Sequence, residues 1–113
     1  MMEILTNVGT AYDTISASKG LGWGLIDFTG ITQITMAIKV SKVGSGTQTW
    51  QLWNDTDSAE IGAIADSGAT GDKVLEQTFT GLVLTGVKRI RIRCKSTTAS
   101  DDPIYYSGSV LAK

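Results

Sequence analysis

The most regular alternation of apolar and polar residues lies between Ile31 and Asn54. From Ile34 to Val40 every second residue is a large apolar one, and this period of two predicts a strand that is buried on one face. Gly44–Gly46 tolerates the positive φ angles of a tight reversal. Thr47–Asn54 is rich in Thr and Trp, which favour strands, so we predict a β-hairpin from these two strands.

A second alternating stretch runs from Val87 to Lys95. One face is apolar and consists of Ile90, Ile92 and Cys94. The opposite face is a cationic row of four side chains spaced by about 7 Å along the strand: Arg89, Arg91, Arg93 and Lys95. Three roles are open for this row: a solvated outer face neutralised by carboxylates on adjacent strands, a contact for an acidic protein surface, and a nucleic-acid contact. The last is disfavoured because no aromatic residue interleaves with the arginines.

The rest of the chain predicts further short strands separated by turn residues. Their expected ranges are 2–8, 11–18, 24–28, 60–66, 73–80 and 104–111. No segment has an apolar period of 3.6 residues. About eight strands with turn signals at this spacing predict an all-β fold, a single antiparallel β-sandwich of jelly-roll type.

Length, charge and cysteine content narrow the classes of protein. A chain of 113 residues predicts a single domain, 1–113, with residues 1–10 as a candidate N-terminal arm. The net charge of −1 argues against general binding to nucleic acid or to an anionic membrane. No apolar run reaches the ~20 residues of a membrane span. The N-terminus has neither the basic start nor the apolar core of a secretory signal, so we expect no secretion by a signal peptide.

Catalytic and metal-binding residue sets are not recognisable. The chain has no histidine, which excludes Ser–His and Cys–His pairs. The single cysteine, Cys94, is in phase with apolar residues and is expected to be an inert buried thiol. Oxygen ligands for Ca²⁺ could come from Asp55, Asp57 and Glu60, or from Asp101 and Asp102, but no spacing matches a calcium loop. We therefore expect no enzyme activity, no cofactor and no bound metal.

Two tryptophans of the predicted return strand have opposite parity. Trp50 is in phase with Leu52 and is expected in the core, so Trp53 should point outward. An outward tryptophan can be covered by a loop, buried in a subunit interface, or used as a stacking platform for a sugar. Trp23, which lies between two glycines, has the same three alternatives.

Several segments resemble small structural proteins of tailed-bacteriophage virions, of the head decoration or cement type. They are DFTGITQ at 27–33, GT at 46–47 leading to WNDTD at 53–57, GVKRIRIR at 86–93 and DDPI at 101–104. The likeness covers Asp27 to Leu111. It implies a non-enzymatic virion protein that is assembled in the host cytoplasm and has no catalytic residues.

The resulting hypothesis is a capsid decoration protein, likewise a β-sandwich, that binds the outer surface of a phage head and stabilises it. Its partners would be the major capsid protein and two further copies of itself in a homotrimer, with no nucleic acid and no membrane. The expected contact residues are Met1, Met2, Glu3, Ile4, Leu5, Trp53, Arg89, Arg91, Arg93 and Lys95. The alternatives are a tail, baseplate or fibre component, and a carbohydrate-binding β-sandwich module.

Overall fold

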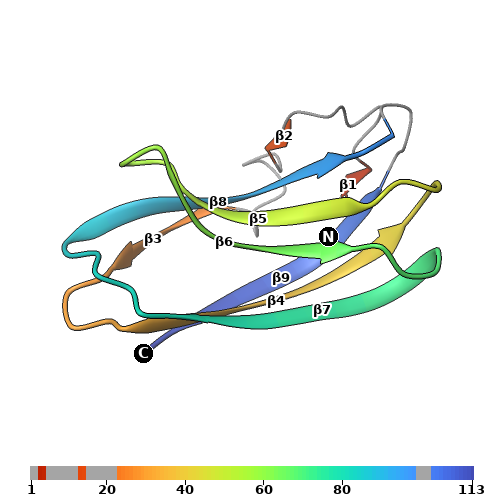
Figure 1. Ribbon diagram of the computed structural model, residues 1–113. Coiled ribbons are helices and arrows are strands. Elements are labelled where there is room, and N and C mark those ends of the chain that lie inside the picture. Colours follow the sequence, from red (N-terminus) through yellow and green to blue (C-terminus); the bar gives the residue numbers. More distant parts are fainter. Residues whose placement is uncertain (1–2, 5–12, 15–22, 99–102) are drawn as a thin grey trace.

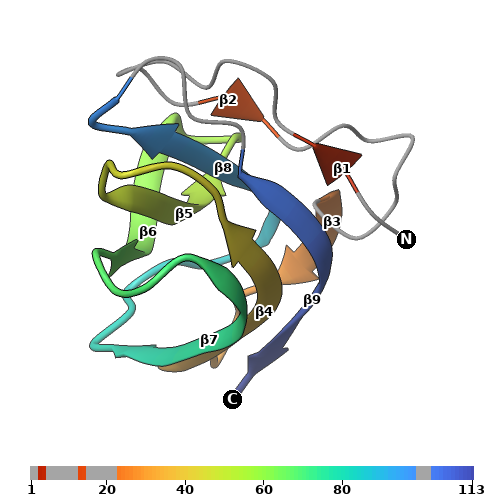
Figure 2. The same ribbon diagram turned by 90° about the vertical axis from the view of Figure 1, so that its right-hand side faces the viewer.

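The computed structural model describes residues 3–4, 13–14, 23–98 and 103–113, and all regular structure in these residues is β-strand. The strands form two antiparallel sheets that face each other (Figures 1 and 2). The predicted all-β sandwich is therefore confirmed. Within the described part of the chain, no helix has the length and apolar character needed to cross a membrane.

Each sheet combines strands that are far apart in the sequence. The first sheet has the order β1 (Glu3–Ile4), β9 (Ile104–Ala112), β4 (Gln33–Lys42), β7 (Gly71–Thr80). The second has the order β2 (Asp13–Thr14), β8 (Val87–Ser96), β5 (Gln48–Asn54), β6 (Ala59–Asp66), and β3 (Trp23–Asp27) also pairs with β8. Seven of these strands have five residues or more, which is close to the predicted number.

The predicted hairpin between the two most regular strands is wrong. β4 pairs with β7 and β9 in the first sheet, whereas β5 pairs with β6 and β8 in the second. The connection at 43–47 therefore passes from one sheet to the other (Figure 1). The physical reason is that both strands have a fully buried face. These faces cover each other only when the strands lie in opposite sheets.

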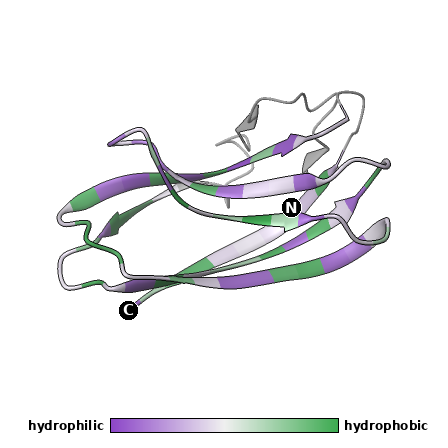
Figure 3. Ribbon diagram, in the orientation of Figure 1, coloured by the Kyte–Doolittle hydropathy of each residue, from purple (hydrophilic) through white to green (hydrophobic). Residues whose placement is uncertain are grey.

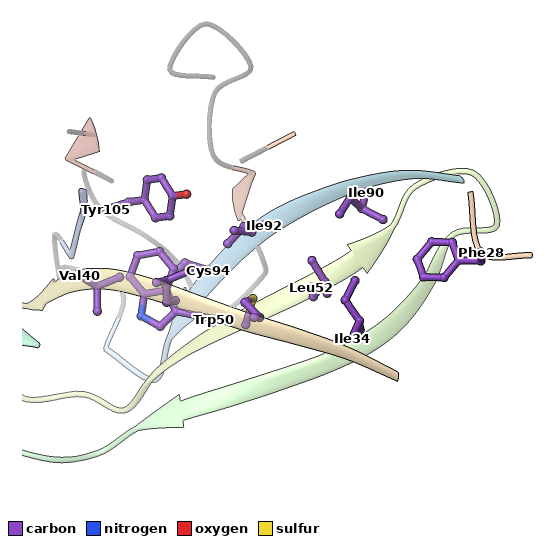
Figure 4. Close-up of a cluster of buried hydrophobic side chains, with 11 residues drawn as sticks. Phe28, Ile34, Val40, Trp50, Leu52, Ile90, Ile92, Cys94 and Tyr105 are labelled. Carbon is purple, nitrogen blue, oxygen red and sulfur yellow. The ribbon is translucent and has the colours of Figure 1, made fainter. Parts of the chain in front are cut away.

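The core is the contact between these inner faces (Figure 4). From the first sheet come the alternating apolar residues of β4 together with Tyr105 of β9, and from the second come Trp50, Leu52 and the apolar face of β8. The ring centroids of Trp50 and Tyr105 lie 6.1 Å apart across the interior. Cys94 and Trp50 are fully buried, as their parity predicts.

The open side of the sandwich is closed where β6 of one sheet meets β7 of the other. Lys73 Nζ lies 2.9 Å from Oδ1 of the buried Asp66, which links the two strands at one end. Further along, the ring of Phe79 occupies the space beside Gly62, and a Cβ at position 62 would lie 2.3 Å from it. Only glycine at position 62 therefore lets the Phe79 ring lie where it does.

We expect Gly62→Ala to destabilise the protein by about 1–3 kcal/mol, the usual cost of inserting a methyl group into a packed interior. Gly24→Ala is the matched control, because its Cβ would meet nothing within 4 Å. Urea unfolding of both variants measures the difference in the free energy of unfolding. Equal stability of the two variants would contradict the role assigned to Gly62.

Candidate functional site

The cationic row lies on the outer face of the second sheet, next to the outward residues of β5. In the strand register Lys95 is opposite Thr49, Arg93 is opposite Gln51 and Arg91 is opposite Trp53. Figure 3 shows hydrophilic segments along β8 alternating with hydrophobic ones. We call this surface the outer strip: Thr49, Gln51, Trp53, Asp55, Glu60, Arg89, Arg91, Arg93 and Lys95.

Arg93 is the centre of a contact network in the strip. Its guanidinium lies over the indole of Trp53, with Cζ 3.8 Å from the ring centroid. Its Nε donates to Oε1 of Gln51 at 2.8 Å, and Nε2 of Gln51 donates to Oε1 of Glu60 at 2.9 Å. Gln51 is only 3% exposed although it points outward. Both ends of its amide have partners, so its orientation is held by the network.

The half-buried Trp53 is thus covered on one face by an arginine and not by a loop. Stacking of a guanidinium on an indole is a cation–π contact worth roughly 0.5–1 kcal/mol at exposed sites. Any ligand that stacks on Trp53 would have to use the opposite ring face or the edge of the indole.

The turn after β5 fixes the other end of the strip. Asp55 Oδ2 lies 2.6 Å from Nη2 of Arg91. Asp57 Oδ2 lies 2.9 Å from Nζ of Lys88 and also accepts a hydrogen bond from Nδ2 of Asn54. The hydrogen bonds from Lys88 and Asn54 lower the pKa of the Asp57 carboxyl. The turn is therefore tied to β8 by two ion pairs.

The four cations of the row have different surroundings. Arg91 is neutralised by Asp55, as a solvated outer face predicts, whereas the Nε of Arg93 bonds to a neutral amide. Arg89 is exposed, and its guanidinium has no partner among the described residues. Lys95 is half-buried beside Thr49. Neutralisation by neighbouring carboxylates thus accounts for part of the row.

The other predicted site residues lie elsewhere. Glu3 and Ile4 form the edge strand β1 on β9 of the same chain, opposite Tyr105 and Ile104. Met1, Met2 and Leu5 fall outside the described residues, as does most of the candidate arm. Trp23 begins β3, and its side chain is not described.

The carboxylates weighed as calcium ligands have other partners. Asp55 and Asp57 pair with Arg91 and Lys88, and Glu60 accepts the hydrogen bond from Gln51. Among the residues that the structure describes, no group of three or more Cys, Asp or Glu side chains is arranged to hold a metal ion. Asp101 and Asp102 lie outside the described residues.

Sequence reasoning did not assign Gln51 to the strip, nor Glu60 and Asp55 except as calcium ligands. Gln51 has the same parity as Trp53, and that signal was available. The contact with Glu60 follows a register shift between Leu52 and Trp53, where β6 has an irregularity opposite β5. Such shifts are not visible in an alternating pattern.

No protein-family model matches the chain, and no curated protein sequence matches it. Solved structures do. The carbohydrate-binding module CBM4 has a TM-score of 0.59 and 11% identity, over 80% of this chain and 59% of that one. The carbohydrate-binding module CBM6cm-2 of Cellvibrio mixtus lichenase 5A, in complex with cellotriose, has a TM-score of 0.58 and 9% identity, over 100% of this chain and 86% of that one.

A viral structure shares the same sandwich. The structure of infectious bursal disease virus, Gx strain, has a TM-score of 0.50 and 14% identity, over 97% of this chain and 29% of that one. At these identities the three likenesses show the fold alone. They confirm the jelly-roll type of sandwich, and this chain spans 59% of the length of the CBM4 chain.

We expect Arg93→Lys to lower the free energy of unfolding by about 1–2 kcal/mol, because it removes the stacked guanidinium and the bond to Gln51. Quenching of tryptophan fluorescence by acrylamide should also increase as Trp53 loses its cover. Arg89→Lys is the matched control on the same strand and should change stability by less than about 0.5 kcal/mol. If both variants behave alike, Arg93 does not organise the strip.

Proposed function

We propose that the chain is a non-catalytic carbohydrate-binding β-sandwich and that the outer strip is its glycan-contacting surface. The observation that carries the proposal is the Arg93 network, which places an aromatic ring beside amide, carboxylate and guanidinium groups on one sheet face. The likeness of the fold to carbohydrate-binding modules supports it.

The chemistry of the strip suits a sugar. One face of a pyranose ring carries C–H groups that can lie against an indole, while its hydroxyls both donate and accept hydrogen bonds. Glu60 is exposed and uses Oε1 for Gln51, so its second oxygen can accept from a hydroxyl. The bond from Arg93 to Gln51 holds these groups in position before a ligand arrives, which lowers the entropic cost of binding.

Head decoration stays a prediction, together with its capsid partner, its trimeric assembly and its location in the virion. The cationic row and Trp53 do lie together on one surface, as a protein contact would also require. However, no described feature favours a protein partner over a glycan. Absence of enzyme activity is likewise a prediction.

The test is binding of the full chain to a panel of plant and bacterial polysaccharides, measured by affinity electrophoresis and tryptophan fluorescence. We expect at least one polysaccharide to retard the protein and to shift or quench its fluorescence. Trp53→Ala should weaken that binding by about tenfold or more, as truncation of a central aromatic contact does. Lys39→Ala on the outer face of the other sheet should leave binding unchanged. A flat response across the panel would overturn the proposal.

A further inference from the structure

A small polar hollow continues the outer strip at the end remote from Asp55. Its volume is about 260 Å³, and it is lined by Thr47, Thr49, Lys95, Ser96 and Thr97. The Thr47 amide donates to Oγ1 of Thr97 at 2.9 Å, and the Thr97 amide donates to the Thr47 carbonyl at 3.1 Å. These two bonds hold the walls of the hollow together. Its size, just below the ~300 Å³ of the smallest drug-sized sites, suits a group no larger than one sugar.

The hollow and the Trp53 network belong to one surface. Thr49 and Trp53 are four residues apart on the same face of β5, a separation of about 13 Å along the strand. Lys95 and Arg93 lie opposite Thr49 and Gln51 in the register. A ligand that contacts Trp53 and extends along β5 therefore reaches the hollow.

The charge of this surface is positive although the whole chain is not. All three arginines of the protein and one lysine lie on the outer face of β8, whereas the carboxylates of the strip are Asp55 and Glu60. Asp27 lies at the far edge, opposite Val87. The net charge of the whole chain is −1. A positive strip on such a chain favours an anionic ligand over a neutral one.

The hollow offers a specific arrangement for a carboxylate. Lys95 supplies an ammonium group, and the threonine side chains beside it supply hydroxyls. A carboxylate accepts hydrogen bonds from both kinds of donor, and such bonds are stronger when one or both partners are charged. A narrow hydroxyl-lined hollow fits a single acidic sugar better than it fits a protein surface or a nucleic-acid backbone, which need long contact surfaces.

We propose that the hollow around Thr49 and Lys95 is an acidic-sugar subsite, which binds the carboxylate of a uronic acid residue in a polysaccharide whose neighbouring residues contact Trp53. This inference rests on the proposed glycan binding and assigns the ligand to the acidic polysaccharides. Lys95 is then the residue that determines specificity, and Trp53 is the residue that supplies general affinity.

The experiment compares acidic polysaccharides with their own carboxyl-reduced forms, which keep the backbone and linkages but carry no charge. The probes are polygalacturonate, alginate and glucuronoxylan, titrated calorimetrically into the full chain. We expect an acidic polymer to bind about tenfold more tightly than its reduced form, since bonds to charged groups contribute more than neutral ones. The difference should shrink as salt is raised, because exposed charges are screened.

Lys95→Met keeps most of the aliphatic stem and removes the charge. It should remove the preference for the acidic polymer and leave binding of the reduced polymer unchanged. Lys39→Met, on the opposite sheet, is the matched control and should keep the preference. Trp53→Ala should weaken binding of both polymers.

The outcomes separate the two proposals. Equal binding of acidic and reduced polymers, or a preference that survives Lys95→Met, overturns the acidic-sugar subsite and leaves glycan binding standing. If neither form of any probe binds, and the neutral panel is also negative, both proposals are overturned.

Discussion

Burial of two facing apolar surfaces is the interaction on which the rest of the structure depends. β4 supplies one surface, and β5 with β8 supplies most of the other. Burial of apolar area contributes about 25 cal/mol per Å², so a side chain as large as Trp50 fixes its strand strongly. Because neighbouring residues of a strand point to opposite faces, burial of Trp50 and Leu52 also places Gln51 and Trp53 on the outer face.

The outer strip is therefore carried by the two strands that are most firmly anchored in the core. Every second residue of β8 from Ile90 to Ser96 is buried, and the residues between them form the cationic row. A network on such a support keeps its geometry with little loss of entropy on binding. Gln51 illustrates this, since its partners on both sides leave it buried on a face that would otherwise be open to solvent.

Much of the fold could be predicted from the sequence, because alternation reports burial directly. The strand ranges agree closely, and Cys94 and Trp50 lie where their parity places them. The hairpin could not be predicted correctly. Gly44–Gly46 suits a tight reversal and a crossover between sheets equally well, and only the need to cover the buried faces of both strands decides between them.

The candidate site divides in the same way. By itself the sequence determined an all-β chain, the outward direction of Trp53, and one strand face that gathers all three arginines. Only the tertiary structure decided that β5 lies beside β8, which brings Arg93 onto Trp53 and Gln51, and that Gly62 makes room for Phe79. The physical reason is that side-chain parity depends on the local backbone alone. The choice of neighbouring strand depends on how whole faces cover each other, because backbone hydrogen bonds are alike for every sequence.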